Sequence, residues 1–461
     1  MITVSNVITI DNPSRELLSW CTKNLKLRNS EYDKKLRMHF HLGKTPQYLY
    51  LYETHGDKLI LPFGTLRNIL PMINTDELGT DFLFPEKVDY QCKVPLYDYQ
   101  EKAVEEVYWK QYGILQSPAG SGKTQMAIAL IVKLGKRALW VTHTKDLLTQ
   151  SKQRAEQYMD PSLLGTITEG QVNIGKGITF ATVQTMCNLD LAQYKNMWDV
   201  IIVDECHRAA GTPTAVSQFS KVLNSLAARH KYGLTATVHR SDGLIKATFA
   251  LIGDVIYAVP QEAVADKIMR VGICPIPTDI GVTRKCQNPD GTVNYPRMIN
   301  YLCENQERNK LIVECITANR DMPSLILSDR LEHLETLMAM LPADMREDAV
   351  MVSGNMTTKK GKAEREQAIA DMRSGAKMYL FATYPLAKEG LDVPRLERLY
   401  MATPQKDFAV ITQSIGRIAR TSKDKADPVV YDFVDDIPHL ANAYKKRCTT
   451  YRKNGCYFVE R

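Results

Sequence analysis

The sequence predicts an α/β protein in which two successive parallel-sheet domains follow a small α+β module. Short, continuous apolar runs alternate with segments of helical periodicity, which is typical of parallel strands covered on both faces. This pattern pauses over residues 275–297 and then restarts, and the first 90 residues do not share it. A length of 461 residues also suits three domains, at roughly 150 residues each.

The front module is expected over residues 1–90, where strand-like patches at residues 48–53 and 58–62 lie among basic residues. The first parallel-sheet domain is expected over residues 91–265, with strands at residues 113–116, 138–143, 178–183, 199–205 and 232–237. The second is expected over residues 266–461, with strands at residues 324–329, 349–354, 377–383, 398–404 and 428–434. Ligands of such sheets bind outside the carboxyl ends of the strands. The motifs below follow these strands.

The composition excludes several classes of protein. Hydrophobic residues make up 44% and charged residues 24%, which excludes wholesale disorder and a small disulfide scaffold. No apolar stretch reaches the ~18 residues of a membrane-spanning helix, and the N-terminus lacks a basic segment before its apolar residues. We therefore expect a cytoplasmic protein without a membrane partner, whose 10 cysteines are reduced. The net charge of +7 is compatible with a nucleic-acid partner but does not require one.

A phosphate-binding loop is predicted at residues 117–124 (SPAGSGKT), between a strand and a helix. Gly120 and Gly122, with Ser121 between them, would let backbone N–H groups surround phosphates at the start of a helix. Lys123 would add a positive charge, and the Thr124 hydroxyl would ligate Mg²⁺. The alternative is a glycine-rich turn with a chance Lys-Thr pair. The strand–loop–helix context favours the phosphate loop.

Two carboxylates, Asp204 and Glu205, follow the apolar run at residues 200–203. Asp204 would hold Mg²⁺, and Glu205 would orient and deprotonate an attacking water. An acidic pair after a strand is most often a solvated loop, but the phosphate loop earlier in the chain favours a catalytic pair.

The third motif is a helical segment with Gln413, Arg417 and Arg420. The two arginines are three residues apart and so share one helix face. Arginines stabilise the charge that develops during phosphoryl transfer. A basic surface helix is the alternative, although such a helix would need neither Gln413 nor Gly416.

In this order the motifs resemble those of superfamily 2 helicases and translocases, over about residues 95–440. The resemblance implies two RecA-like domains that share one ATP at their interface. It also implies that Gln100, in the segment LYDYQ, contacts adenine, and that Thr235 and Thr237 belong to a coupling motif. Thr383 opens a further motif, in which Gly390 and Asp392 would bind the nucleotide.

The segment GLTATVHRSDG at residues 233–243 is similar to a block of the branch that includes XPB-type repair helicases and phage branch-migration helicases of the UvsW type. Val238 replaces the usual proline, while Arg240 and Asp242 keep the spacing used near the DNA fork. Residues 49–69 resemble the DNA-binding front domain of this branch. A phage origin is inferred from the same resemblance.

Relatives lay a single-stranded backbone across both domains, and the matching motif positions imply phosphate contacts here. Such contacts fix register without reading sequence, whereas the alternative is ordinary loop residues or helix caps. The basic C-terminal residues Lys445, Lys446, Arg447, Arg452 and Lys453 are expected to form a solvated face. The implied nucleic-acid contacts are Thr144, Lys145, Thr182, Gln184, Thr185, Arg240, Ser328, Arg330 and Thr383.

The function expected from this resemblance is that of a monomeric, ATP- and Mg²⁺-dependent DNA helicase or branch-migrating translocase in recombination, repair or replication. Its partner would be single-stranded, forked or branched DNA. The alternatives are an RNA helicase, an ATP-gated nucleic-acid-binding scaffold and the motor subunit of a restriction enzyme, which would need a partner for cleavage.

Overall fold

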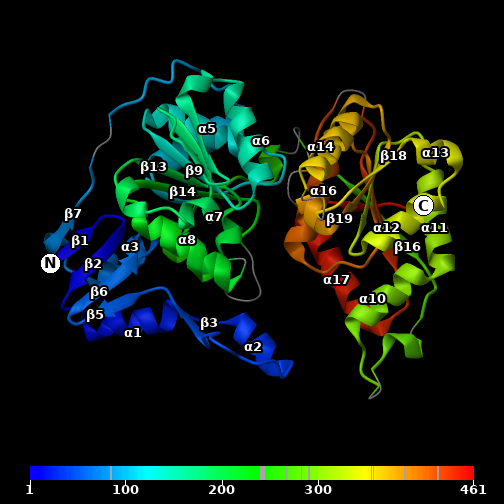
Figure 1. Ribbon diagram of the computed structural model, residues 1–461, viewed down its shortest axis with the longest axis horizontal. Helices are drawn as coiled ribbons and strands as arrows, with labels where there is room; N and C mark the ends of the chain where they lie inside the picture. Colours follow the sequence, from blue (N-terminus) through cyan, green and yellow to red (C-terminus); the bar gives the residue numbers. More distant parts are fainter. Residues whose placement is uncertain are drawn as a thin grey trace. The chain divides into compact units, whose positions relative to one another are not determined.

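The computed structural model describes residues 1–83, 86–210, 212–238, 244–264, 268–281, 283–288, 291–354, 356, 358–388, 391, 393–422 and 425–460. The chain divides into two compact units, Met1–Pro118 with Gly122–Pro260 and Ala119–Ser121 with Gln261–Arg461 (Figure 1). Both contain a parallel sheet covered by helices, so the predicted α/β fold class is confirmed. Among the described helices, none has the length and apolar character needed to cross a membrane.

The first unit is built on an eight-stranded sheet in the order β11-β10-β12-β9-β13-β14-β8-β15. All of its ladders are parallel except the β10–β11 hairpin. The five strands predicted for this domain are all present: β8 (Tyr112–Gln116), β9 (Ala138–Thr142), β12 (Ile178–Thr182), β13 (Val200–Val203) and β14 (His230–Thr235). The sequence did not reveal β10 (Leu164–Thr168), β11 (Gln171–Asn173) and β15 (Val255–Ala258).

Helices cover this sheet, and the most buried of them follows the phosphate loop. Helix α5 (Lys123–Leu134) is capped at both ends by left-handed glycines and buries every residue from 126 to 131. This is why its sequence is apolar all round, since a helix of that kind belongs in a core. The other helices here are α4 (Asp98–Tyr108), α6 (Lys145–Glu156), α7 (Val183–Cys187), α8 (Pro213–Ser225) and α9 (Ile245–Ile252).

The front module lies within the first unit and contains a five-stranded sheet in the order β5-β6-β2-β1-β7. The sheet packs with side chains of α8 and α9 into one hydrophobic cluster, in which Ile8, Leu59 and Ala247 are fully buried. Its elements are β1 (Ile2–Val4), β2 (Val7–Asp11), α1 (Arg15–Asn24), β5 (Glu53–His55), β6 (Lys58–Pro62), η1 (Phe63–Thr65), α3 (Leu66–Ile69) and β7 (Leu78–Thr80).

A glycine makes this contact close. A Cβ atom on Gly64, in η1, would lie 2.6 Å from the carbonyl oxygens of Phe249 and Ala250 at the end of α9. The backbones of the module and of the parallel-sheet domain therefore touch, which only a residue without a side chain allows.

An arm extends from the module between α1 and β5. It consists of β3 (Lys26–Arg28), α2 (Ser30–Arg37) and β4 (Tyr48–Tyr50), with β3 and β4 paired antiparallel. Helix α2 buries none of its residues. In Figure 1 it lies at the far end of the arm from the five-stranded sheet.

The second unit contains a seven-stranded sheet in the order β18-β19-β17-β20-β21-β16-β22, whose ladders are all parallel. The five predicted strands are again present: β17 (Ser324–Ser328), β18 (Ala349–Val352), β19 (Tyr379–Thr383), β20 (Arg398–Met401) and β21 (Val429–Val434). Two strands were not predicted, β16 (Gly272–Pro277) and β22 (Tyr457–Phe458). The helices are α10 (Tyr295–Glu304), α11 (Gln306–Thr317), α12 (Leu331–Ala339), α13 (Ala343–Glu347), α14 (Lys359–Ser374), α15 (Tyr384–Lys388), α16 (Phe408–Ile418) and α17 (Pro438–Lys453).

Candidate functional site

The predicted phosphate loop follows β8 and leads into α5. Gly120 has φ 81° and Gly122 has φ 79°, a left-handed conformation that glycine adopts without strain. The Lys123 ammonium group donates to the carbonyl oxygens of Ser117 and Pro118, each at 3.3 Å. The loop thus curls around its own lysine at the start of a helix, a position at which backbone N–H groups and the helix dipole favour anions.

Gln100 packs directly against this loop, as its implied role in nucleotide binding requires. It lies in the first turn of α4 and is buried. Its Oε1 accepts a hydrogen bond from the backbone N–H of Tyr97 at 3.0 Å. A Cβ atom on Gly122 would lie 2.5 Å from Gln100 Nε2, so the loop glycine and the amide are in contact.

The carboxylate of Asp204 is buried just beyond the end of β13. Its Oδ1 accepts from the Glu205 backbone N–H at 2.9 Å, and its Oδ2 accepts from the Ser151 hydroxyl at 3.2 Å. Burial and the neighbouring Glu205 charge raise the pKa of Asp204 to about 6, while the Lys123 ammonium opposes that rise. Asp204 and Lys123 are therefore electrostatic neighbours.

Glu205 has an unusual backbone conformation. Its φ is 46°, in the left-handed region that a non-glycine residue adopts only at a cost. Strained residues of this kind cluster at functional sites, where the surrounding structure holds them. The predicted catalytic carboxylate is thus one of the strained residues of the chain.

His207 and Thr235 join the two neighbouring strands β13 and β14. His207 is buried, and its Nδ1 lies 3.0 Å from Thr235 Oγ1 and 3.3 Å from Glu205 Oε2. The Thr235 hydroxyl donates to the carbonyl of Thr237 at 2.8 Å, and the Thr235 carbonyl accepts from the N–H of Ser117 at 2.9 Å. Burial lowers the pKa of His207, against the opposing effect of Glu205. Sequence reasoning assigned no role to this histidine, although it follows the predicted catalytic Glu205 by only two residues.

Thr124 and Asp204 are the residues that would hold Mg²⁺. Their hydroxyl and carboxylate oxygens are of the kind this ion prefers, and a buried carboxylate with a raised pKa gains from a nearby cation. No group of three or more His, Cys, Asp or Glu side chains that could hold a metal occurs among the described residues. Mg²⁺ commonly takes one or two protein ligands together with substrate phosphates.

The implied nucleic-acid contacts of the first unit gather at the ends of two paired strands, β9 and β12. Gln184 Nε2 donates to the carbonyl of His143 at 2.9 Å, which ties α7 to the segment before α6. The remaining four residues are nearby in the same two segments. Thr144 caps α6, Lys145 pairs with Glu169 at 2.7 Å, and the Thr182 hydroxyl donates to Thr185 at 2.9 Å.

In the second unit, Ser328 and Thr383 are direct partners at the ends of β17 and β19. Ser328 is fully buried, its hydroxyl lies 3.0 Å from His333 Nδ1, and it accepts from the N–H of Arg330 at 3.1 Å. Ser328 therefore shapes the turn that carries Arg330. The guanidinium of Arg330 donates to Asn300 on α10 at 2.9 Å.

The predicted glutamine and arginine motif lies on α16 and just beyond it. Gln413 is buried, and its Oε1 has no hydrogen-bond partner among the described residues. Arg417 donates to the carbonyl of Leu391 at 2.9 Å. The predicted residues Arg240, Asp242, Gly390 and Asp392 lie outside the described residues.

One expectation for the C-terminal basic residues is wrong. Arg447 was assigned to a solvated face, yet it is buried and donates to the Asp432 carboxylate at 2.8 Å and to the Gln405 carbonyl at 3.0 Å. Helical spacing turns it away from Lys445 and Lys446, which are exposed, and toward the buried face of α17. A run of basic letters can therefore span both faces of one helix.

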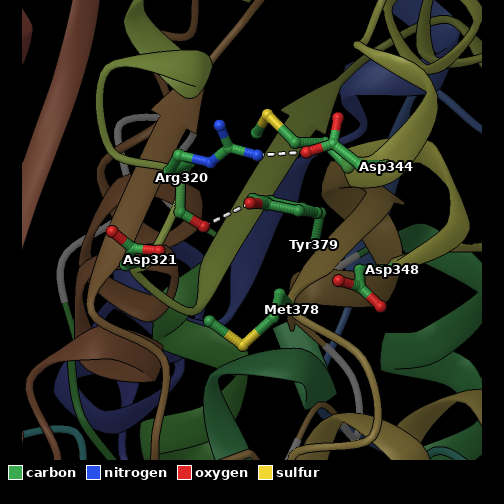
Figure 2. A pocket seen from close by; sticks show the side chains of 7 residues that line it. Arg320, Asp321, Asp344, Asp348, Met378 and Tyr379 are labelled. Atoms are coloured by element: carbon green, nitrogen blue, oxygen red, sulfur yellow. Dashed lines mark hydrogen bonds and ion pairs between the residues drawn. The ribbon is translucent and has the colours of Figure 1, made fainter.

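A hollow in the second unit lies away from all these motifs. Figure 2 shows it at the amino ends of the strands, where Tyr379 begins β19 and Asp348 precedes β18. An ion pair between Arg320 and Asp344 and a hydrogen bond from the Tyr379 hydroxyl to the Arg320 carbonyl cross it. The motifs follow the carboxyl ends of the strands, so this hollow belongs to the opposite edge of the sheet.

The arm of the front module carries positive charge and exposed apolar side chains. Residues 26–50 contain six Lys or Arg and two acidic residues. Lys26 and Arg28 lie over the ring of Tyr48, at 4.2 and 5.2 Å from its centre. At the end of α2, Met38 and Phe40 are 50% and 58% exposed. Basic side chains interleaved with aromatic rings are suited to nucleic acid.

Comparison with known proteins identifies two family matches. The family described as "Type III restriction enzyme, res subunit" matches residues 93–240, and the family described as "Helicase conserved C-terminal domain" matches residues 307–422. Together they cover more than half of the chain. A fragment of a putative HsdR subunit of a type I restriction enzyme from Vibrio vulnificus has the same fold over 80% of this chain and 69% of that one, with 17% identity and a TM-score of 0.57.

Curated relatives are named as helicases and translocases. The chain is 27% identical to the putative ATP-dependent RNA helicase L396 of Acanthamoeba polyphaga mimivirus, over 70% of this chain and 60% of that protein. It is 25% identical to the probable helicase D10 of Escherichia phage T5, over 74% and 72%. A shorter match, 32% identical over 38% of each chain, is to the DNA 3'-5' translocase XPB2 of Sulfurisphaera tokodaii. The chain belongs to the superfamily 2 helicases, a family of ATP-hydrolysing enzymes.

Proposed function

We propose that this protein is an ATP-driven DNA helicase or branch-migrating translocase. One observation carries the proposal: the phosphate loop, the Asp204–Glu205 pair and Thr235 follow three neighbouring strands of one sheet and are joined by hydrogen bonds. A nucleotide bound at the loop would thus lie beside the strained carboxylate of Glu205. The neighbouring His207 contacts Thr235 at the end of the next strand, β14.

The residues divide the work of hydrolysis among them. The backbone of Gly120, Ser121 and Gly122 binds the phosphates together with Lys123, and Gln100 binds the base. Glu205 orients the attacking water and accepts its proton. Thr124 and Asp204 would hold Mg²⁺, which would supply positive charge beside the phosphates. Gln413, Arg417 and Arg420 complete the site and stabilise the developing charge, with Gly390 and Asp392 as further nucleotide contacts.

Movement requires contacts that grip the backbone without reading bases. Hydroxyl, amide and cationic groups at the ends of the parallel strands meet this requirement, because they bind phosphate in any sequence. They are Thr144, Lys145, Thr182, Gln184, Thr185, Arg330 and Thr383, with Ser328 holding the turn before Arg330 and with Arg240 completing the set.

DNA is favoured over RNA by two observations. The GLTATVHRSDG segment is similar to a DNA-acting branch, and a relative is named a DNA translocase. The basic arm of the front module adds a surface for forked or branched DNA, as expected of a motor in recombination, repair or replication. An RNA helicase is the second candidate, because the relative L396 is named as one.

The test compares ATP hydrolysis, strand displacement and branch migration on matched DNA and RNA substrates of equal length. We expect Mg²⁺-dependent hydrolysis that nucleic acid stimulates, with unwinding or branch migration on DNA. Lys123→Ala should abolish turnover. Glu205→Gln should bind ATP but hydrolyse it about 10²- to 10⁴-fold more slowly, since the proton acceptor is lost and the side-chain shape is kept.

Each contrary outcome rejects a defined part of the proposal. Unwinding confined to RNA would favour the second candidate. Undiminished turnover in Glu205→Gln would reject the assigned base. Binding without any turnover in the unaltered protein would indicate an ATP-gated scaffold.

A further inference from the structure

A partly buried lysine outside the known motifs, Lys425, holds the end of α16, the helix that carries Gln413 and Arg417. The ammonium group of Lys425 donates three hydrogen bonds, to the carbonyl oxygens of Pro394 at 2.9 Å, Ile418 at 2.7 Å and Arg420 at 2.7 Å. An ammonium group has three N–H donors, and here all three are used. Such complete use fixes the position of every group that takes part.

Two of the three acceptors belong to the end of α16. This helix ends at Ile418, with Ala419 as its cap. The last carbonyls of a helix lack partners within the helix and carry its negative dipole end, so a cation there is favourable. Lys425 satisfies two of the carbonyls in the segment that leads from Arg417 to Arg420.

The third acceptor ties a separate segment to the same point. Pro394 follows Leu391, whose carbonyl accepts from Arg417 at 2.9 Å. Leu391 and Pro394 are therefore joined to α16 by two cations, Arg417 through the Leu391 carbonyl and Lys425 through the Pro394 carbonyl. Losing either bond would leave only one of these two polar links between these residues and the helix that carries the arginines.

The backbone of Arg420 is also held from another side. The N–H of Met269 donates to the carbonyl of Ala419 at 2.7 Å, and Ile268 forms a β-bridge with Arg420. Arg420 lies beyond the last regular turn, where helical hydrogen bonds no longer set its direction. Its backbone depends on Lys425 on one side and on residues 268–269 on the other.

We propose that Lys425 is a positioning residue for ATP hydrolysis, which sets the geometry of Arg417 and Arg420 through the backbone of α16 and the carbonyls of Leu391 and Pro394. The inference rests on the proposed function, because it takes these two arginines as part of the hydrolysis site. Lys425 itself contacts three backbone carbonyls and no substrate group is assigned to it.

The proposal has a consequence for pH. Burial lowers the pKa of Lys425 to about 8; Glu397 opposes this shift and Arg420 adds to it. The Glu397 carboxylate accepts from the N–H of Ala426 at 3.2 Å. A neutral amine has two N–H donors instead of three, so one of the three bonds is lost as the pH rises through this value. The turnover number should therefore fall above pH 8.

The test uses the full-length protein and its nucleic-acid-stimulated ATPase. Lys425→Met removes the donors with little change in length, and Lys425→Arg keeps a positive charge at every pH used. Lys445→Met is the matched control, because Lys445 is exposed on α17 of the same unit. The turnover number, the KM for ATP and the melting temperature are measured from pH 6.5 to 9.5 (about three units of pH, which bracket the lysine's pKa).

Lys425→Met should lower kcat by on the order of 10- to 100-fold, the size expected when catalytic groups are displaced by about 1 Å. The KM for ATP should change little, because the phosphate loop is intact. The unaltered protein and Lys445→Met should lose kcat above pH 8, whereas Lys425→Arg should lack this loss.

The inference is overturned if Lys425→Met keeps the kcat of the Lys445→Met control. If Lys425→Met does not fold, the comparison of the unaltered protein with Lys425→Arg decides: an identical pH profile overturns it. Failure of the proposed function would look different, since the unaltered protein would then show no stimulated hydrolysis at any pH.

Discussion

The Nδ1 atom of His207 lies 3.0 Å from the Oγ1 atom of Thr235, so the ends of β13 and β14 are linked side chain to side chain. His207 also lies beside Glu205, and the Thr235 carbonyl binds the first residue of the phosphate loop. Thr235 thus contacts the phosphate loop through its backbone carbonyl, and it contacts His207, the neighbour of Glu205, through its side-chain hydroxyl. Its carbonyl bond survives any change of side chain, whereas its hydroxyl bonds do not.

Thr235→Val should therefore separate hydrolysis from strand movement. Valine keeps the shape of threonine but cannot bond His207 or Thr237, while the phosphate loop keeps its backbone partner. We expect DNA-stimulated ATPase within about 10-fold of the unaltered protein, and a larger loss, on the order of 10²-fold, in strand displacement. Thr179→Val is a suitable control, since that buried hydroxyl binds Trp198 and Gly175 away from the motifs. Equal losses in both assays would contradict a coupling role.

Arg417→Ala should lose hydrolysis but keep nucleic-acid binding. Removal of an arginine that stabilises the transferred phosphoryl group costs on the order of 10³-fold or more. The readouts are single-turnover ATP hydrolysis with saturating DNA and DNA affinity without nucleotide. Arg452→Ala, an exposed arginine of the same unit, is the control. Normal hydrolysis in Arg417→Ala would remove this residue from the site.

The arm of the front module should contribute to DNA affinity through charge. Lys34, Arg37 and Lys44 are exposed on it, and their joint replacement by glutamine should lower the slope of log affinity against log salt by about 2 to 3, at ~0.9 per phosphate contact. Replacement of Lys445, Lys446 and Arg452 removes the same charge from α17 and should leave the slope nearly unchanged. The measurement is junction binding across a salt series. Identical slopes for the two triple variants would contradict a role of the arm.

Point replacement is a better test here than truncation. The five-stranded sheet of the front module shares its hydrophobic cluster with Tyr112, Leu244 and Ala250 of the parallel-sheet domain. A chain that starts near residue 90 would expose these side chains to water, and burial of each large apolar side chain stabilises a fold by about 2 kcal/mol. Such a chain should be heat-labile whether or not the arm binds DNA.

Lys231 should make the stability of the first unit depend on pH. Its ammonium group is buried beneath the front module and donates to the Leu223 carbonyl at 2.8 Å, and burial lowers its pKa to about 7. Below pH 7 both the folded and the unfolded chain carry the charge, and the fold bears the full cost of burying it. Between pH 7 and the unfolded value of ~10.4 the folded state is neutral first, so stability rises with pH.

Lys231→Met should remove this rise. Between pH 6 and pH 9, the free energy of unfolding of the unaltered protein should rise by on the order of a few kcal/mol relative to that of Lys231→Met. Calorimetry at several pH values gives this difference, and Lys93→Met, at an exposed lysine, is the control. A difference that is constant with pH would show that Lys231 does not titrate in this range.

Strands with continuous apolar runs could be predicted from the sequence, because strands buried on both faces have no polar alternation to obscure them. Every strand predicted for the two parallel-sheet domains is present. The missed strands lack that signal. Strand β16 contains Pro275 and Pro277, which indicated a break in the sequence pattern. Strand β22 pairs only with the first two residues of β16, Gly272 and Ile273, so the prolines face no ladder partner on the β22 side. Strand β10 is interrupted by Gly165 and by threonines.

Candidate site residues could be proposed from the sequence where a motif fixes their spacing, as in the phosphate loop and the Asp204–Glu205 pair. Residues that act through the backbone of others could not. Lys425 and Arg447 are both basic residues in polar stretches of the sequence. Only the fold shows that Lys425 caps the carbonyls at the end of α16 and that Arg447 pairs with Asp432, rather than both being solvated. Long-range pairings such as Arg447 with Asp432 depend on which helix face meets the sheet.

The close backbone contact at Gly64 has a mechanical consequence. If the front module were joined to the parallel sheet by a flexible linker, the module could change its orientation independently of that sheet. The contact between η1 and the end of α9, with a shared core around it, leaves no such compliance. A rotation of the first unit's sheet should therefore turn the five-stranded sheet of the front module, from which the arm extends, by the same angle.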